Sequence, residues 1–449
     1  MIRLPPAASE ELSHLDGNIW IKTVVKSAYK LTREVSIQIQ TILRELHPIK
    51  GFVYGRCALE NDTLTCEIHP RKGSKAVCSG CGCKCPGYDR LEKRTFSFIP
   101  FWGLMVMFVY RMRRVDCKRC GVKVEQVPWA TGKHRACDAF RLFLSRWAKR
   151  LSWSETADAF QTSWDTVYRS VQWVVEFGLN HRSLDGIEAV GVDEVAYSKG
   201  HNYMTLVYQI DHGMKRLLFI GKDRCESTLR DIFQQFGQEK CAGIKVVCSD
   251  MWKPYLNVIR DQLPNALNIL DRFHIVKKLN EAVDQVRREE TKAMRREGYE
   301  PVLTSSRYCF LKRYSNLTPN QEDKLADLLK YDLRTVRAYC HKEAFDAFWQ
   351  YKSAYWAGWF LTKWCTRVMR SRLEPMKKFV GTMRNHEELI MNYFKTKERY
   401  SSGIVEGLNL KVNLTMRKAY GFKSFPVMET ALYHQLGHLP EPEFAHRFC

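Results

Sequence analysis

Residues 186–222 read GIEAVGVDEVAYSKGHNYMTLVYQIDHGMKRLLFIGK, in which three apolar runs are separated by short polar turns. Apolar runs of roughly four to eight residues, bounded by turn residues, predict strands. The three runs are Ala189–Val192, Tyr203–Ile210 and Arg216–Ile220. This stretch therefore predicts the start of a mixed α/β domain.

The strand pattern continues downstream, now with helices between the strands. Ile244–Cys248 and Leu267–Leu270 read as strands, and helical stretches at Glu226–Phe236 and Pro254–Gln262 precede them. Three strands with short turns, then helix, strand, helix and strand, is the order expected of an RNase H-like core. Residues 272 to about 397 read as almost wholly helical, which we interpret as an insertion into that core.

Three acidic residues are the candidate catalytic groups. Asp193 and Asp250 directly follow predicted strands, and Glu406 lies in the first turn of a predicted helix. Parallel strands bring such carboxyl ends together beside a crevice, where carboxylates are unfavourable unless they bind a cation or hydrogen-bond partners. Three carboxylates suit two Mg²⁺ or Mn²⁺ ions, which activate a water or a 3′-hydroxyl for in-line attack on a phosphodiester. A turn or helix cap is the alternative for any one of them.

Four neighbouring polar residues have secondary or supporting roles in this interpretation. Glu194 adjoins the first aspartate but should point to the opposite side of an extended strand. Asp271 and His274 lie three residues apart at the start of a helix, where capping and packing explain them as well as contact with a phosphate or a water does. Asn409 shares a polar helical stripe with Glu406.

Two CxxC turns bracket strand-forming sequence nearer the amino end. Their cysteines are Cys78, Cys81, Cys117 and Cys120. The spacing suits one structural zinc ion held tetrahedrally by four thiolates, with no open position for catalysis. Cys83 and Cys85 adjoin the first turn and are alternative ligands, and buried thiols without metal are the competing explanation.

Basic and helical segments around these turns predict contact with DNA. The ribbon carries Arg111, Arg113, Arg114, Lys118 and Arg119. Phosphate contact is the expected use of these side chains, and a solvated face is the alternative. Residues 152–175 read as two short helices around a tight turn, with Ser154 and Ser163 as expected N-caps. The second helix of this helix-turn-helix would present Trp164, Thr166 and Arg169 to the major groove.

The composition is typical of a folded protein that binds nucleic acid. Among 449 residues, 71 Lys and Arg against 49 Asp and Glu give a formal net charge of +22, which attracts polyanions. A hydrophobic content of 45% is that of a folded globule. The first ten residues are not those of a secretory signal, so we expect a cytoplasmic protein with reduced cysteines. The apolar stretch Phe98–Tyr110 contains Pro100 and Gly103 and predicts a strand pair, not a membrane helix.

Four motifs taken in order resemble those of a known family. They are Gly191–Glu194, Cys248–Tyr255, Leu270–Lys278, and Gly403–Asn409 continuing to Arg417–Phe422. With them, residues 51 to about 425 resemble the DDE transposases of the ISL3 insertion-sequence family. The resemblance implies that Asp193, Asp250 and Glu406 form the metal-binding triad. It also implies a bacterial, nucleoid-associated protein that recognises the terminal inverted repeats of its own element.

The predicted architecture is multidomain, α+β and α/β. The expected segments are a helical extension of unassigned role (1–50), a zinc ribbon (51–135), a helix-turn-helix (136–183), the first part of an RNase H-like core (184–289), an all-helical insertion (290–395) and the last part of the core, which carries Glu406 (396–449). The extension reads as helix over residues 10–46.

The predicted function is a transposase that cleaves and joins DNA strands. Its partners would be double-stranded DNA of the inverted repeats and the target, contacted also by Arg417 and Lys418. We expect a homodimer or larger synaptic assembly, because two ends must be brought together. A regulator that binds DNA without cutting it is the alternative, but it has no need of all three acids. A repair nuclease of the RNase H class would not require the ribbon and the helix-turn-helix.

Overall fold

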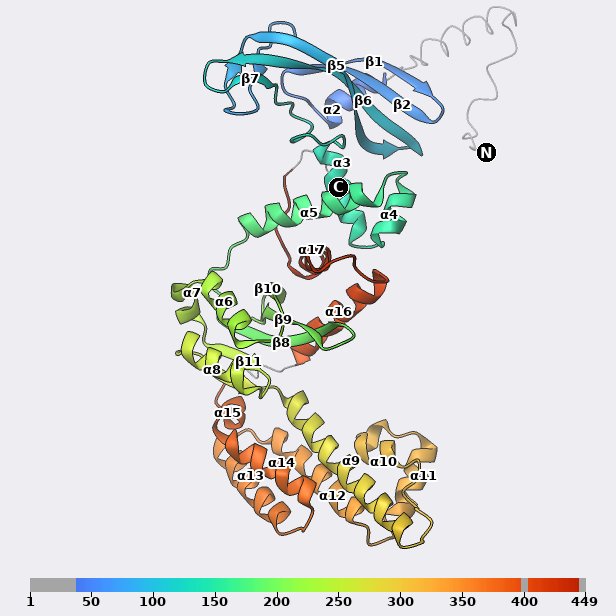
Figure 1. Cartoon of the computed structure of the whole chain (residues 1–449), viewed down its shortest axis with the longest axis vertical. Coiled ribbons are helices and arrows are strands. Elements are labelled where there is room, and N and C mark those ends of the chain that lie inside the picture. Colours follow the sequence, from blue (N-terminus) through green and yellow to red (C-terminus); the bar gives the residue numbers. More distant parts are fainter. Residues whose placement is uncertain (1–37, 397–402, 444–449) are drawn as a thin grey trace, which may run out of the picture. The chain divides into compact units, whose positions relative to one another are not determined.

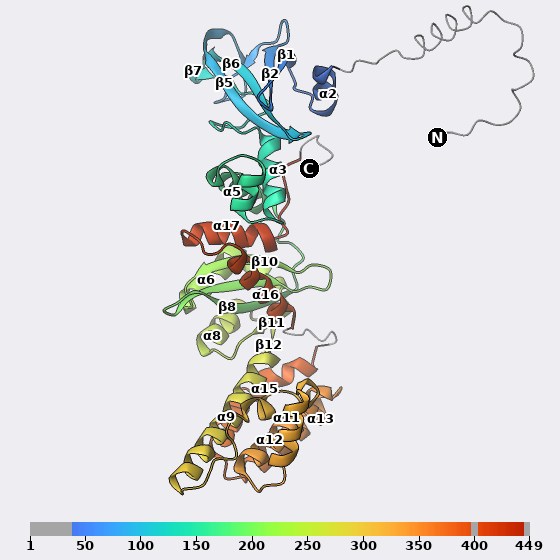
Figure 2. The same cartoon turned by 90° about the vertical axis from the view of Figure 1, so that its right-hand side faces the viewer.

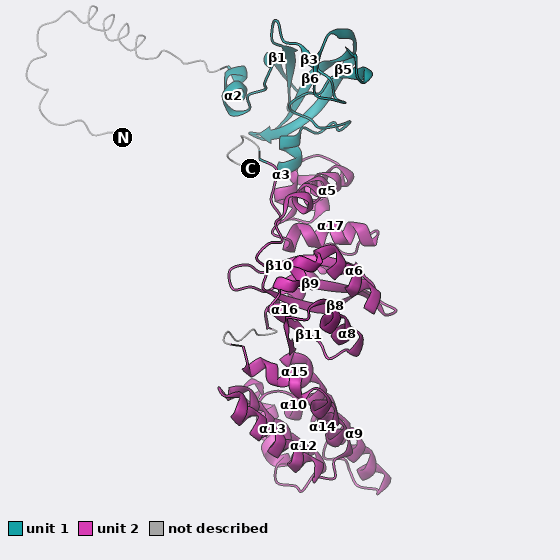
Figure 3. Ribbon diagram, turned by 90° about the vertical axis from the view of Figure 1, so that its left-hand side faces the viewer, with its two compact units in different colours: residues 1–143, 443–449 teal, residues 144–442 magenta. Residues whose placement is uncertain are grey.

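The computed structural model describes residues 38–396 and 403–443. The chain divides into two compact units, residues 1–143 with 443–449, and residues 144–442 (Figure 3). The helix predicted over residues 10–46 lies mostly outside the described residues, and its last part is helix α2 (Ile39–Leu46).

The first unit is built on one five-stranded sheet. Its strands are β1 (Phe52–Glu60), β2 (Thr63–Pro70), β5 (Gly87–Phe101), β6 (Leu104–Cys117) and β7 (Gly121–Val124). The order is β1-β2-β6-β5 with β7 beside β6, and only the β2–β6 pair is parallel. The predicted strand pair over Phe98–Tyr110 is confirmed as the end of the β5–β6 hairpin, which turns at Trp102 and Gly103 with positive φ at both. Trp129 fills the core, with its ring nearly perpendicular to those of Phe52 and Phe96.

Two further strands hold the first CxxC turn in the same unit. Strands β3 (Ala76–Val77) and β4 (Lys84–Cys85) pair antiparallel across it. The second CxxC turn closes the β6–β7 hairpin. The two turns therefore lie at the ends of separate hairpins.

The predicted pair of helices is present as α4 (Trp153–Ala159) and α5 (Trp164–His181), after α3 (Asp138–Ala148). The prediction that both are short is correct only for α4, because α5 has 18 residues and continues past residue 175. Ser163 caps α5 as expected, since its hydroxyl accepts the backbone N–H of Thr166. The expected cap at Ser154 is wrong. Helix α4 begins at Ser152, whose hydroxyl accepts from the N–H of Glu155 while the Glu155 carboxylate accepts from the N–H of Ser152.

The second unit contains the predicted mixed sheet. Its strands are β8 (Ala189–Ser198), β9 (Asn202–Gln209), β10 (Arg216–Lys222), β11 (Val246–Ser249) and β12 (Leu267–Leu270). They lie in the order β10-β9-β8-β11-β12, of which Figure 1 labels the first four. Strands β8, β9 and β10 are antiparallel neighbours, whereas β11 runs parallel to both β8 and β12. The prediction that Asp193 follows the end of its strand is wrong, because β8 pairs with β11 only over Ala189–Gly191 and then continues beside β9 to Ser198. Asp193 therefore lies inside β8, just past the part that pairs with β11.

Helices cover both faces of this sheet. On one face, Val190 and Val192 of β8 share a core with α6 (Glu226–Phe236) and α8 (Lys253–Gln262). A short helix that the sequence did not predict, α7 (Gln238–Gly243), follows α6. On the other face lies α16 (Gly403–Lys418), which packs against β8 (Figure 2).

Helices are the regular secondary structure in the described part of the segment between β12 and α16, as predicted. Its helices are α9 (Arg272–Arg296), α10 (Arg307–Leu311), α11 (Pro319–Leu328), α12 (Arg334–Asp346), α13 (Ala354–Met369), α14 (Glu374–Asn385) and α15 (Glu387–Met391), with short 3₁₀ turns η1 (Tyr314–Asn316), η2 (Ala347–Gln350) and η3 (Asn392–Phe394). They share one apolar core centred on Phe310, Phe345 and Phe348.

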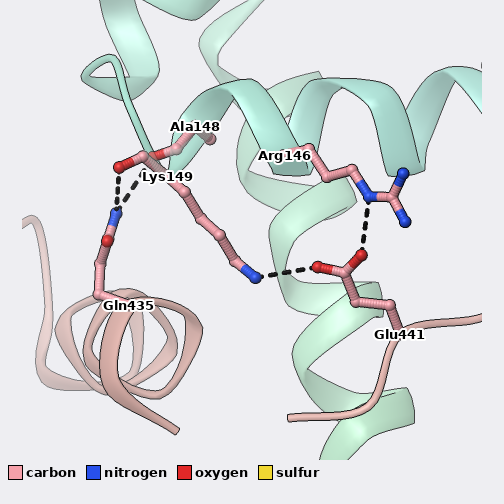
Figure 4. A network of polar contacts seen from close by, with 5 residues as sticks. All are labelled: Arg146, Ala148, Lys149, Gln435 and Glu441. Atoms are coloured by element: carbon pink, nitrogen blue, oxygen red, sulfur yellow. Dashed lines mark hydrogen bonds and ion pairs between the residues drawn. The ribbon is translucent and has the colours of Figure 1, made fainter. Parts of the chain in front are cut away.

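The last helix, α17 (Phe425–Leu436), ties the end of α3 to the rest of the second unit. Gln435 donates to the carbonyls of Ala148 and Lys149, and Glu441 accepts from Arg146 at 2.7 Å and Lys149 at 2.9 Å (Figure 4). Across the ranges 38–396 and 403–443, no helix is long and apolar enough to cross a membrane.

Candidate catalytic and metal-binding sites

Asp193 lies on β8 where the fully buried part of that strand ends. Its Oδ1 accepts the backbone N–H of Glu194 at 2.8 Å. Its Oδ2 accepts a hydrogen bond from the Asn409 amide of α16. This second bond joins Asp193, the first of the three predicted catalytic acids, to a helix more than 200 residues later in the chain.

Two neighbours explain why α16 approaches so closely. A Cβ at Gly191 would lie 2.5 Å from Val405 Cγ2, so glycine at this position lets the helix pack directly on the strand. The Tyr208 hydroxyl donates to Asn409 Oδ1 at 2.7 Å. This bond leaves the amide nitrogen of Asn409 to face Asp193.

Asp250 and Asp271 are the first residues after β11 and β12, respectively. Asp250 accepts the N–H of Met251. Asp271 caps α9 by accepting the N–H of Phe273 at 2.7 Å, and its other oxygen contacts His274 Nδ1 at 3.0 Å. The capping alternative for Asp271 is therefore correct, and the same carboxylate also orients the histidine.

The charges at this edge influence one another. Burial raises the pKa of Asp193. Burial also lowers the pKa of His274, but its hydrogen bond with Asp271 and the charges of Asp250 and Asp193 outweigh that effect and raise the pKa to about 9. His274 is consequently a cation at neutral pH, placed among three aspartates.

Glu194 lies on the opposite face of β8, as the alternation of the strand predicts. Its carboxylate pairs with Arg224 at 2.6 Å, and the Arg224 guanidinium lies 4.4 Å from the ring centroid of Trp252. Burial raises the pKa of Glu194 to about 7, with further contributions from the charges of Asp193 and Asp250. Sequence reasoning missed Arg224, because nothing in its local sequence separates it from the many other arginines.

Glu406 is exposed in the first turn of α16, one helical turn before Asn409. Within the described ranges, the ligand oxygens of Glu406, Asp193 and Asp250 do not all lie within 4.8 Å of one another. The structure brings Asp193, Asp250, Asp271, His274 and Asn409 together. Glu406 lies on the same helix as Asn409, one turn earlier, and is exposed.

The sulfur atoms of Cys78, Cys81, Cys117 and Cys120 all lie within 4.8 Å of one another, which suits a bound metal ion. The N–H groups of Arg119 and Cys120 lower the pKa of the Cys117 thiol to about 6. Cys85 is buried beside the cluster and Cys83 is exposed, and neither belongs to it. The four cysteines that converge are those of the two CxxC turns.

The basic residues of the ribbon differ in what they contact. Arg113 pairs with buried Glu125 at 2.7 Å, and Arg114 pairs with Asp89. Arg111, Lys118 and Arg119 are exposed. The exposed three keep their charge available to a ligand, whereas Arg113 stabilises the fold around Glu125.

The residues of the second unit that are expected to contact DNA also differ in their contacts within the protein. The Trp164 ring stacks on Tyr168, and Lys423 Nζ lies 4.2 Å from the Trp164 centroid. The Thr166 hydroxyl is bonded to Ser163, and the exposed Arg169 pairs with Asp165 at 3.0 Å. Lys418 donates to the carbonyl of Arg150, while Arg417 is exposed.

Comparison with known proteins identifies the chain's relatives. A family model of ISL3-type DDE proteins, described as a transposase, matches residues 190–432, a range that includes Asp193, Asp250 and Glu406. The transposase for insertion sequence element IS1001 of Bordetella parapertussis is 25% identical over 368 residues, covering 81% of this chain and 90% of the relative. The transposase for insertion sequence element IS1557 of Mycobacterium tuberculosis is 27% identical over 401 residues, covering 83% and 88%.

Proposed function

Because the chain belongs to the ISL3 family of insertion-sequence transposases, we propose that Asp193, Asp250 and Glu406 carry its DNA cleavage and strand transfer. The observation that carries this assignment is the hydrogen bond from Asn409 to Asp193. It ties α16, the helix that also carries Glu406, to β8 at Asp193.

The donor set fits divalent cations such as Mg²⁺ or Mn²⁺. All three side chains offer carboxylate oxygens, and burial of Asp193 makes its charge unfavourable until a cation neutralises it. Two bound ions would activate the attacking hydroxyl or water and stabilise the leaving oxygen. Among the chain's own groups, Asn409 fixes the orientation of Asp193, and Asp271 fixes that of His274.

His274 has a separate role in this proposal. Its positive charge and its position among the aspartates suit it to bind a non-bridging phosphate oxygen of the scissile bond. Because Asp271 holds Nδ1, the Nε2 atom is the one that remains to donate to the phosphate. Asp271 and His274 are thus supporting residues.

The four-cysteine cluster is proposed to hold one structural zinc ion in a zinc ribbon. Four converging thiolates form a closed tetrahedral set, which stabilises a fold and leaves no position for a substrate. The ribbon, together with helices α4 and α5, would bind the terminal inverted repeats. Arg111, Lys118, Arg119 and Arg417 are exposed for phosphate contact.

The strand order of the second unit supports an RNase H-like catalytic core interrupted by the helices α9 to α15. Joining two element ends requires at least two active sites, so we propose a homodimer or larger synaptic complex. The alternative of a DNA-binding regulator that does not cut predicts binding of the ends without any Mg²⁺-dependent nick.

The test is incubation with the element's own ends and Mg²⁺, with nicks mapped to the nucleotide. Asp193→Asn, Asp250→Asn and Glu406→Gln should each reduce cleavage below detection while binding of the repeats persists. Glu239→Gln, an exposed residue of α7, is the matched control and should cut like the wild type. Cleavage at the wild-type rate by any of the three variants would remove that residue from the site.

A further inference from the structure

Helix α13 (Ala354–Met369) carries three large aromatic side chains on its exposed face. Tyr355, Trp356 and Trp359 are 74%, 54% and 51% exposed. The opposite face of the helix is buried through Ala357, Leu361, Trp364, Cys365 and Val368. The three exposed rings are therefore not needed to hold the helix in place, and a group of this kind marks an interaction surface.

These rings lie next to one another but do not cover one another. The centroids of Tyr355 and Trp356 are 5.3 Å apart with planes at 79°, and those of Trp356 and Trp359 are 6.2 Å apart at 77°. Near-perpendicular rings meet edge to face. Each ring can therefore offer surface to a planar ligand.

The sequence around the rings is basic. Residues 347–373 contain no Asp or Glu, and their cations are Lys352, Lys363, Arg367, Arg370 and Arg372. In the part of the chain that the structure describes, none of these five is in an ion pair with a carboxylate. Lys363 Nζ lies 5.7 Å from the Trp359 ring centroid.

The spacing places rings and cations on one helical face. Within α13, Trp356, Trp359, Lys363 and Arg367 follow at intervals of three or four residues, and Lys352 lies just before the helix begins. An alternation of planar aromatic groups and positive charges matches an alternation of bases and phosphates.

We propose that the exposed face of α13 binds single-stranded DNA, with unpaired bases stacked on Tyr355, Trp356 and Trp359 and phosphates against the cations. Paired duplex hides the faces of its bases, so exposed rings gain little from it. A second copy of this chain, at a net charge of +22, would bring like charge to the same surface. The proposal rests on the proposed function in one respect: cleavage of a DNA strand is what exposes unpaired bases to this surface.

Binding of a fluorescent oligothymidylate to the full chain, without divalent metal, tests this surface. Trp356→Ala and Trp359→Ala should each weaken binding roughly 5- to 150-fold, and Trp356→Phe should restore most of it. Lys363→Ala should reduce the slope of log affinity against log salt by about 0.7. Because no cleavage is measured, an inactive catalytic site leaves this result unaffected.

Tyr331→Ala is the matched control. Tyr331 is 48% exposed in the same helical segment but lies beside Asp332, and its removal should leave binding unchanged. Affinity of the Trp356→Ala/Trp359→Ala double variant equal to that of the wild type would overturn the proposal. So would a loss of self-association by sedimentation with unchanged oligothymidylate binding, which would make the face a contact between copies.

Discussion

His274 places a positive charge among Asp193, Asp250 and Asp271, and this charge should appear in the stability of the protein. Its pKa of about 9 in the folded state exceeds the value of about 6.5 expected when unfolded. The stabilisation is therefore fully present below about pH 6.5 and is lost as pH rises through about 9. In metal-free protein, His274→Gln should lower the melting temperature most at pH 6 and least above pH 9.

An Asp271→Asn background provides the control for this pH dependence. Without the Asp271 carboxylate, the main cause that raises the pKa of His274 is absent. The effect of His274→Gln should then vary much less between pH 6 and pH 10. A difference in melting temperature that is constant with pH in both backgrounds would contradict a charged His274.

Individual residues of the site differ in how far sequence could identify them. Asp250 follows the apolar strand β11, whereas Asp193 lies inside β8, after its fully buried part. The apolar run before each aspartate was the useful signal in sequence, although it ended the first strand at Val192 instead of Ser198. The Asn409 contact and the Arg224 pairing join segments far apart in the chain, and no local pattern encodes them. The position of the Glu406 carboxylate also depends on how the chain returns after the inserted helices.

At the scale of single elements, the start of α4 can be tested. Ser152→Ala removes the hydroxyl that caps the helix and should cost about 1 kcal/mol of helix stability. Hydrogen exchange of the α4 amides should accelerate accordingly. Ser154→Ala, at an exposed position inside the same helix, is the control and should change exchange little.

If the α4 amides exchange at the same rate in the Ser152→Ala and Ser154→Ala variants, the hydroxyl of Ser152 is not the cap of the helix. The correct start was readable from the sequence, because Ser152 and Glu155 have the spacing of a capping box. Ser154 has no Glu or Gln three residues later, so the residue type alone was an insufficient signal.

The four clustered cysteines come from two hairpins, so under the proposed zinc site the metal and the fold of the ribbon should be lost together. Cys117→Ser, or a strong chelator, should release zinc, unfold the ribbon and weaken binding of the inverted repeats. Zinc content per chain and circular dichroism measure the first two effects. Cys83→Ser is the control, because Cys83 is exposed and outside the cluster, and full zinc content is expected.

Retention of DNA affinity after verified loss of zinc would contradict a binding role for the ribbon. Its elements were predictable only in part. The apolar centre of the β5–β6 hairpin is evident in sequence, whereas its outer ends around Arg90 and Arg113 are polar. These outer ends form strands because β5 and β6 pair with each other there, and the local sequence of either strand does not indicate that pairing.

For the whole molecule, the charge of +22 predicts strong dependence of DNA binding on salt. If six or more phosphates are contacted, affinity for duplex ends should fall at least about 10³-fold between 50 and 200 mM salt. Glu406→Gln should show the same slope as the wild type, since it changes chemistry and not the contacts. A shallow slope in titrations of both proteins would mean that few of the exposed cations touch DNA.

The distribution of the three acids along the chain has a consequence during synthesis. Strands β8 and β11 carry Asp193 and Asp250, but α16 brings Glu406 only after the helices α9 to α15 have been made. The ribosome therefore synthesises the cysteine cluster and helices α4 and α5 long before it reaches Glu406. Under the proposed function, a prematurely terminated polypeptide would occupy element ends without cutting them, and would compete with intact copies of the enzyme.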